Sequence, residues 1–288
     1  MLGTPVVSVI MSTYNDANYL PQAVESIQAQ TYKDFEFLIV DDASTDETPK
    51  ILASYARQDT RITCFYNSEN KGLTKNLNFL LKQAKGKFIA RMDGDDISEP
   101  ARFAEEIQVM CHQDVDLVWT NALLIDDEGR KICERYQPSL EYTLAKLSDK
   151  ARWGNYIVHP SVMFKKQTVL VLGGYDEKYR FGQDGELWMR MKKKGCRFAL
   201  INKPLLKYRI GSNSITTKRL GYGDINFLYA YMCLANRQPE KSWQYLRGVK
   251  SLRRKLYLLI RWLVGEDVIH FLKGFRIDNY DQTHKRSL

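Results

Sequence analysis

Residues 87–96 read Lys-Phe-Ile-Ala-Arg-Met-Asp-Gly-Asp-Asp, a mostly apolar run that is followed at once by three carboxylates. A short apolar run bounded by polar residues is typical of a strand buried within a sheet. The acids after it, Asp93, Asp95 and Asp96, are therefore predicted at the carboxyl end of a strand. In open α/β sheets, this edge is where ligands bind.

The same alternation of strand and helix runs through the first third of the chain. Strands are predicted at 6–11, 35–40, 61–66 and 87–92. Apolar residues at helical spacing follow these runs and predict the intervening helices. The second strand ends at Asp41 and Asp42, and Ser44–Glu47 is predicted to be a capping box that opens the next helix. Four such units predict a parallel sheet covered by helices on both faces.

The second half of the chain is less regular and predicts a mixed sheet. The expected elements are helices at 101–110 and 185–194, a turn at 126–129, and strands at 117–125, 131–136, 159–164 and 197–201. We therefore expect one α/β domain over residues 1–215, divided into halves at 1–97 and 98–215. A helical and basic extension is expected at 216–288.

The composition argues for a globular protein without a membrane span. Of 288 residues, 44% are hydrophobic and 27% are charged, which is ordinary for a folded domain. The longest stretch without Asp, Glu, Lys or Arg is 1–15, which is too short to cross a bilayer, and the start lacks the basic residues of a secretory signal. Five scattered cysteines argue against a disulfide framework or a zinc site. These features favour a cytoplasmic protein.

The positive charge is concentrated at the end of the chain. The net charge is +9, and residues 241–288 contribute 11 basic minus 4 acidic residues, or +7, which leaves +2 for residues 1–240. Within 242–264 the apolar and basic residues fall on different faces of a helix. Such a helix would bind an anionic membrane surface at the inner face of the cytoplasmic membrane, or pack on the catalytic domain or on a second subunit in a homo-oligomer. Because the rest of the chain is nearly neutral, nucleic acid is not an expected partner.

Asp93 and Asp95 have the spacing and position of a site for a metal ion and a diphosphate. Carboxylate oxygens suit Mg²⁺ or Mn²⁺, which keep water ligands and take further ligands from phosphates. A cation there would stabilise the charge that a nucleoside diphosphate gathers as it leaves a sugar. The alternative is a tight polar turn. The chain contains neither G-x-G-x-x-G nor a P-loop, which argues against dinucleotide oxidoreductases and ATPases.

A third acidic cluster, Asp184 and Glu186, lies at the predicted start of the helix at 185–194. Displacement in one step with inversion needs a single base to take the proton of an acceptor hydroxyl, and Asp184 is the candidate. Its alternative role is that of a helix N-cap. Glu186, His159 and Arg209 are weaker candidates for contact with the acceptor or a phosphate, because a structural histidine or a surface arginine is an equally simple interpretation.

Five segments of the chain, in this order and spacing, resemble the motifs of glycosyltransferase family 2. They are 7–15, 40–46, 70–73, 90–96 and 182–188. The likeness covers roughly residues 6–215. It is specific for the family and not for a substrate.

The resemblance implies the A-type glycosyltransferase fold, in which a Rossmann-like mixed sheet carries helices on both faces. It implies that residues 1–97 bind a nucleotide sugar, that 98–215 bind the acceptor, and that Mn²⁺ or Mg²⁺ is the cofactor. The residues that would line the nucleotide are Ser12, Thr13, Tyr14, Asp41, Asp42, Lys71 and Asp93. Asp93 and Asp95 would hold the metal ion, and Asp184 would be the general base.

Two positions depart from the family pattern. The family often has Glu before the catalytic Asp, where this chain has Gln183. It also has a histidine in a Tyr-Arg-x-His segment, where this chain has Gly211. The first change leaves the base in place, whereas the second removes a pyrophosphate or metal contact.

We therefore expect an inverting glycosyltransferase that moves a sugar from a nucleoside-diphosphate sugar, first of all a UDP-sugar, to a hydroxyl of a glycan or lipid-linked glycan in cell-surface polysaccharide synthesis. One alternative is a sugar-phosphate nucleotidyltransferase, which should carry a glycine-rich N-terminal loop that is absent here. The other is a noncatalytic polyanion-binding protein that uses the basic tail. It would leave the three acidic clusters unexplained.

Overall fold

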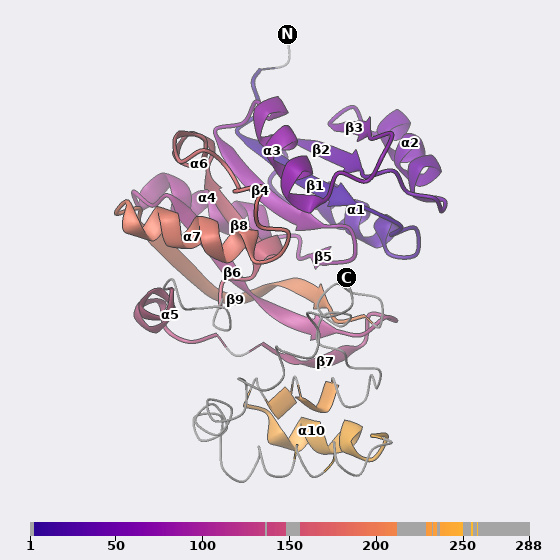
Figure 1. Ribbon diagram of the computed structural model, residues 1–288, viewed down its shortest axis with the longest axis vertical. Helices are drawn as coiled ribbons and strands as arrows, with labels where there is room; N and C mark the ends of the chain where they lie inside the picture. Colours follow the sequence, from indigo (N-terminus) through magenta and orange to yellow (C-terminus); the bar gives the residue numbers. More distant parts are fainter. Residues whose placement is uncertain are drawn as a thin grey trace, which may run out of the picture. The chain divides into compact units, whose positions relative to one another are not determined.

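The computed structural model describes residues 3–135, 137–147, 156–211, 229–231, 233–234, 237–249, 255 and 258. The chain divides into two compact units (Figure 1). Unit 1 comprises Met1–Leu123 and Gln137–Arg209, and unit 2 comprises Leu124–Tyr136 and Ile210–Leu288. The segment expected at 98–215 is thus shared between the units, because the hairpin at 124–136 belongs to unit 2.

The first part of unit 1 is the predicted parallel sheet. Its strands are β1 (Val7–Thr13), β2 (Phe35–Asp41), β3 (Ile62–Tyr66) and β4 (Phe88–Asp93). They lie in the order β3-β2-β1-β4, and each neighbouring pair is parallel. The four strands expected from the apolar runs are therefore confirmed.

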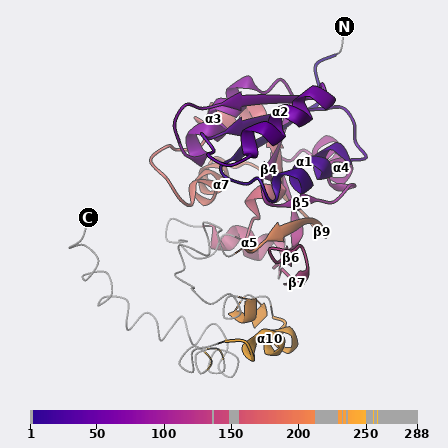
Figure 2. The ribbon, with the colours of Figure 1, turned by 90° about the vertical axis from the view of Figure 1, so that its right-hand side faces the viewer.

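Helices cover both faces of this sheet, as predicted. They are α1 (Leu20–Gln28), α2 (Thr48–Gln58), α3 (Leu73–Gln83), α4 (Arg102–His112) and α7 (Gln183–Lys193). Val9 of β1 packs in a core cluster with residues of α1, α2 and α4, whereas its neighbour Ile10 packs in a second cluster with residues of α3 and α7. Successive strand residues point to opposite faces, so one strand feeds both cores. Figure 2 shows α3 and α7 on one side of β4 and α1 and α4 on the other.

Beyond β4 the sheet becomes antiparallel. β8 (Val162–Lys165) pairs with β4 and with β6 (Leu117–Ile125), and β9 (Phe198–Arg209) and β5 (Ile97–Ser98) follow. The mixed sheet expected from the sequence is confirmed.

Several boundaries in the second half were predicted wrongly. The strand expected at 197–201 runs from Phe198 to Arg209. The prediction ended too early because residues 202–204 are exposed and resemble a loop in sequence. The strand expected at 159–164 begins only at Val162, after a 3₁₀ turn over His159–Ser161. Two short helices, α5 (Leu140–Lys146) and α6 (Lys166–Val171), were not predicted.

The predicted capping box at Ser44–Glu47 is also wrong. Helix α2 begins at Thr48, and the N-cap residue Glu47 makes no capping hydrogen bond through its side chain. The Ser44 hydroxyl instead accepts a hydrogen bond from the backbone N–H of Asn15 at 2.9 Å. The segment is a loop in which Ser44 and Thr45 bond to Asn15 of the loop after β1. The helix start is instead served by Asp46, whose carboxylate accepts a hydrogen bond from the N–H of Thr48 at 3.0 Å.

Unit 2 contains the predicted hairpin and helix α10. The turn at 126–129 is closed by the Asp126 carboxylate, which accepts hydrogen bonds from the N–H groups of Glu128 and Arg130 at 3.1 and 2.8 Å. It leads into β7 (Lys131–Glu134), which pairs with β6. Helix α10 spans Pro239–Leu246.

The helix expected at 242–264 lies only partly within the described residues. Residues 242–249, 255 and 258 are described, and the others fall outside. Helix α10 ends at Leu246 and a turn follows at 247–248, so the prediction of one continuous helix over 242–264 is wrong. Among the residues that the structure describes, no helix has both the length and the apolar character needed to cross a membrane.

Candidate active site

The parallel register brings the predicted site residues of three strands to one edge of the sheet. Thr13 at the end of β1 lies opposite Asp41 at the end of β2. On its other side, Ser12 lies opposite Asp93 at the end of β4. Residues far apart in sequence are therefore neighbours at the carboxyl ends of adjacent strands, which is where the sequence placed them.

Asp42 organises one wall of this edge, where the resemblance predicts the nucleotide. We call residues 41–42 and 67–76 the donor wall after this prediction. Its carboxylate accepts hydrogen bonds from the backbone N–H groups of Lys71 and Gly72 at 2.8 and 2.9 Å and from the side-chain amide of Asn67 at 2.8 Å. Burial alone would raise the pKa of Asp42, but the hydrogen bonds, including one involving Asn76, outweigh burial and lower the pKa. Asp42 is therefore an ionised carboxylate whose charge is compensated within the protein.

Ser12 belongs to the same network. The Asn76 amide donates to the Ser12 hydroxyl at 2.9 Å, and the Asn76 carbonyl accepts from Asn67 at 2.9 Å. Thr13 is engaged differently, because its hydroxyl donates to the carboxylate of Asp16 at 2.7 Å. Tyr14 is an exposed ring in the loop that follows.

The loops after β1 and β2 are bonded to each other. Asn15 donates from its backbone to Ser44, and its side-chain carbonyl accepts from the backbone N–H of Thr45 at 2.8 Å. The Asp46 carboxylate accepts from the N–H of Ala17 at 3.1 Å. Asn15 has a φ of 56°, a left-handed conformation that Asn tolerates better than most residues. The two loops therefore act as one structure.

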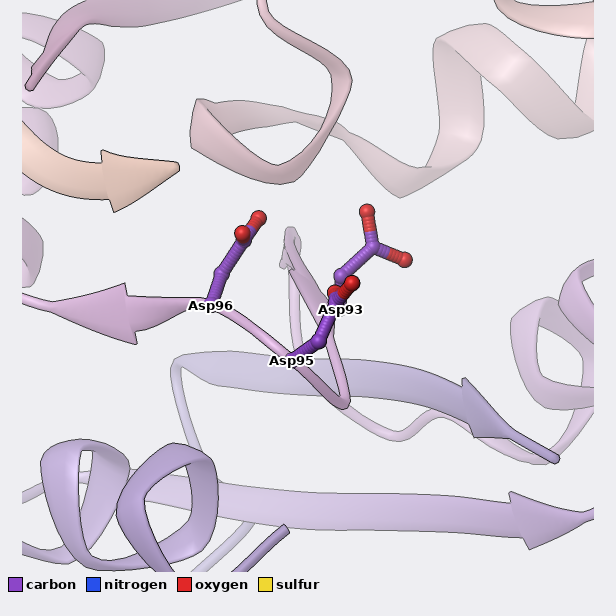
Figure 3. A group of neighbouring side chains, drawn as sticks. All are labelled: Asp93, Asp95 and Asp96. Carbon is purple, nitrogen blue, oxygen red and sulfur yellow. The ribbon is translucent and has the colours of Figure 1, made fainter. Parts of the chain in front are cut away.

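The turn after β4, residues 93–96, carries three carboxylates and is called the acidic turn below. Asp93, Asp95 and Asp96 extend to the same side of the turn (Figure 3). Each offers one oxygen, and these three oxygens lie within 4.8 Å of one another. A Cβ at Gly94 would lie 2.7 Å from a carboxylate oxygen of Asp16, so a larger residue would require Asp16 to move.

The acidic turn has more negative charge than its surroundings compensate. Burial, together with the nearby charges of Asp93 and Asp16, raises the pKa of Asp95 to about 7. Burial and the charges of Asp95 and Asp93 also raise the pKa of Asp96. One oxygen of Asp96 accepts from the N–H of Arg209 at 2.8 Å, whereas the other is buried and has no hydrogen-bond partner among the described residues. A divalent cation would offset this charge, so the donor set fits Mg²⁺ or Mn²⁺.

Arg91 is a buried cation beneath the acidic turn. Its side chain is only 1% exposed and forms an ion pair with Asp93. The backbone carbonyl of Arg91 accepts a hydrogen bond from the guanidinium of Arg102 at 3.0 Å. The Arg102 guanidinium also donates to the carbonyl of Pro160 at 2.8 Å. Arg102 thereby holds the end of β4 to the turn that contains His159.

Asp184 lies in the first turn of α7 and is not the N-cap. That position belongs to Gly182, whose φ of 73° is left-handed. Burial raises the pKa of the Asp184 carboxyl; the charge of Asp93 adds to this effect, and backbone hydrogen bonds and the charge of Arg91 oppose it. The charges of Asp93 and Arg91 also act on Asp95. Asp184 and the acidic turn therefore share one electrostatic environment.

The three weaker candidates, His159, Glu186 and Arg209, form hydrogen bonds or ion pairs with other residues of the protein. His159 is half-buried, bonds through Nε2 to the Tyr175 hydroxyl at 2.9 Å, and has its pKa lowered by desolvation and by the charge of Arg91. Glu186 forms a two-pronged ion pair with Arg190 at 2.6 and 2.7 Å. Arg209 donates to the backbone carbonyl of Asp95 at 2.7 Å, so it supports the acidic turn from within.

The sequence did not point to five residues that complete the site. They are Asp16, Asn67, Asn76, Arg91 and Tyr175. The pKa of Asp16 is raised by burial, and the pKa of buried Tyr175 by burial and the charges of Asp184 and Asp93. Only Arg91 left a signal, since a charged residue within an apolar strand requires a buried partner.

The chain was compared with known proteins. The family model described as glycosyl transferase family 2 matches residues 8–168. The O-antigen biosynthesis glycosyltransferase WbnJ of Escherichia coli is 32% identical over 220 residues, which cover 75% of this chain and 84% of that protein.

Solved structures share the fold. S. aureus TarS in complex with UDP-GlcNAc superposes with a TM-score of 0.60 at 18% identity, covering 89% of this chain and 71% of TarS. The mannosyltransferase PcManGT of Pyrobaculum calidifontis, in complex with GDP-Man and Mn²⁺, gives a TM-score of 0.59 at 19% identity, covering 90% of this chain and 79% of that one. These neighbours have the A-type glycosyltransferase fold expected from the sequence. The chain is a transferase and belongs to glycosyltransferase family 2.

Proposed function

We propose that this enzyme transfers a sugar, with inversion, from a nucleoside-diphosphate sugar to a hydroxyl of a glycan or lipid-linked glycan in cell-surface polysaccharide synthesis. The observation that carries the proposal is the group of carboxylate oxygens of Asp93, Asp95 and Asp96, which lie within 4.8 Å of one another, in a fold that also holds the carboxylate of Asp184 at the start of α7. A base and a cluster of metal-type ligands are the two components that the reaction needs. A nucleotidyltransferase or a noncatalytic polyanion-binding protein would not account for this pair, and the family match favours neither.

In the proposed step, Asp184 takes the proton of the acceptor hydroxyl as the oxygen forms its bond to the anomeric carbon. The bond from that carbon to the diphosphate oxygen breaks, and the nucleoside diphosphate leaves with the electron pair. The raised pKa of Asp184 suits proton uptake better than an ordinary carboxylate does. A Mg²⁺ or Mn²⁺ ion held by Asp93 and Asp95 would stabilise the charge of the leaving diphosphate.

On the donor side, we propose that the nucleoside lies against Ser12, Thr13, Tyr14 and the donor wall, in contact with Asp41 and Lys71. Asp42 shapes this wall, because its carboxylate already accepts from the Lys71 and Gly72 backbone. We propose that the nucleoside of the donor is uridine. A neighbour with UDP-GlcNAc supports uridine, whereas a neighbour with GDP-Man keeps guanosine as the competitor.

The test is a calorimetric titration of the full chain with UDP, GDP, dTDP and CDP, each with Mn²⁺, with Mg²⁺ and with EDTA. We expect UDP to bind most tightly and EDTA to weaken its binding. Preference for GDP would show that the donor nucleoside is guanosine rather than uridine, and would leave the proposed reaction class unchanged. Absence of binding for all four nucleotides in the presence of either metal would refute the proposal.

We further propose that residues 1–215 perform the reaction and that the basic extension at 216–288 binds anionic lipid from the cytoplasmic side. In support, the described part of the extension has a hollow of about 840 Å³ lined by Trp243, Leu246, Arg247 and Lys255 among others. Aromatic and basic residues together are typical of an interfacial segment. We expect the full chain to sediment with vesicles that contain anionic lipid and not with neutral vesicles. Equal sedimentation with both kinds of vesicle would indicate that the extension packs on protein instead.

A further inference from the structure

The segment immediately before α7 exposes two aromatic rings. Residues 177–182 are all exposed, and within them Tyr179 and Phe181 are 44% and 46% exposed. The guanidinium of Arg180 lies 5.7 Å from the centre of the Phe181 ring. Large exposed apolar groups close together are a common sign of a binding surface.

The backbone of this segment is fixed at several points. Asn78 of α3 bonds to both the N–H and the carbonyl of Tyr175, at 2.9 and 2.8 Å. The hydroxyl of Thr74 donates to the carbonyl of Tyr179 at 2.9 Å. At its end, Gly182 has the left-handed conformation that starts α7. The two rings are therefore held at the surface by an ordered backbone.

The segment connects the two functional parts of the site. Thr74 is two residues beyond Gly72, whose N–H binds Asp42 in the donor wall. Asp184 follows Phe181 by three residues, so their Cα atoms are at most about 11 Å apart. A sugar docked on the Phe181 ring would therefore lie about one to two sugar lengths from the helix turn that carries the proposed base.

We propose that Tyr179 and Phe181 form the platform on which a pyranose ring of the acceptor glycan stacks. This inference rests on the proposed function, because it requires Asp184 to face the acceptor. A pyranose ring presents C–H groups on its faces, and an aromatic ring offers a large apolar surface with a negative face that attracts them. The polar hydroxyls then remain at the ring edge, where one of them is free to approach the base.

The experiment is saturation-transfer NMR of the full chain with methyl pyranosides of glucose, galactose, mannose and N-acetylglucosamine. We expect transfer to the ring protons of at least one glycoside, and binding about tenfold weaker for Y179A and F181A. The conservative variants Y179W and F181Y should retain binding. Y142A is the matched control, because Tyr142 is 46% exposed in α5, outside this segment.

Nucleotide titration of the same variants separates this inference from the proposed function. If Y179A and F181A bind nucleoside diphosphate as the parent does and lose only the glycosides, the platform is supported. If the parent binds nucleotide but no glycoside, or if the alanine variants bind glycosides unchanged, the platform is wrong and the transferase reaction is unaffected. A smaller mass of the variants in light scattering would show that the rings join two copies of the chain, which would also overturn the inference.

Discussion

The donor wall and the acidic turn both contain a nearly buried aspartate, and the two have opposite pKa shifts. Asp42 is 3% exposed and its pKa is lowered, whereas Asp96 is 1% exposed and its pKa is raised well above the ordinary value. Burial is the largest single influence in both places, so it does not explain the difference. The explanation is that Asp42 receives hydrogen bonds from four residues, whereas the charges that act most strongly on Asp96 are the negative charges of Asp95 and Asp93. The donor wall is electrostatically complete, and the acidic turn needs a partner from outside.

The largest expected effect concerns Asp184, the proposed base. We expect D184N to lower kcat by about 10²- to 10⁴-fold, because the amide cannot accept the proton, and to leave nucleotide affinity unchanged. Steady-state kinetics and calorimetry measure the two quantities. D34N, an exposed aspartate before β2, is the matched control and should keep parental kcat. A parallel loss of both quantities in folded D184N would show that Asp184 binds the donor rather than acting only as the base.

The second prediction tests whether the acidic turn lacks a cation. We expect D95N to weaken Mn²⁺-dependent binding of nucleoside diphosphate by roughly 10- to 100-fold. Without metal, the same variant should melt at a higher temperature than the parent, because it removes one of several repelling charges. Calorimetry and thermal unfolding measure these effects. Lower stability of metal-free D95N would show that the turn is already compensated.

The third prediction concerns the donor wall, where removal of a carboxylate should destabilise the protein rather than stabilise it. We expect D42A to reduce the free energy of unfolding by about 1 to 3 kcal/mol, because it leaves the N–H groups of Lys71 and Gly72 without their acceptor. Urea denaturation measures the change, and E69Q, an exposed acid near the same loop, is the control. A D42A variant as stable as the parent would remove the distinction between the two regions.

The last prediction concerns the dependence of stability on pH. The pKa of Asp95 is raised from 3.8 to about 7, so the unfolded chain loses this proton first, and stability of the metal-free enzyme should fall as pH rises from about 4 to about 7. Glu106, whose pKa burial raises to about 8, acts in the same direction. Added Mn²⁺ should remove the part due to Asp95. Asp42, with a lowered pKa, contributes stability that is lost only as pH falls below about 4. Chemical denaturation across this range with and without Mn²⁺ would detect the effect, and a metal-free enzyme that becomes more stable between pH 4 and 7 would contradict it.

The parts of the molecule predictable from sequence are those that depend on local patterns. The first four strands are continuous apolar runs, and the rule that ligands bind at strand ends is enough to locate Asp41, Asp93 and Asp95 at one edge of the sheet. Asn67 and Asn76 were missed because an amide in a loop or helix has no periodic signature. The role of Arg91 depends on pairing with Asp93 in three dimensions, and the mistaken capping box at 44–47 arose because Ser44 bonds to a loop far away in sequence.

The mutual hydrogen bonds between the loops after β1 and β2 bear on attempts to alter donor choice. Asn15, Ser44 and Thr45 hold one another, so grafting either loop alone from a relative would leave the transplanted segment without its counterpart. A chimera should therefore exchange 14–17 and 43–47 as a pair. For protein engineering, these two short segments are one structural unit that has to be exchanged together.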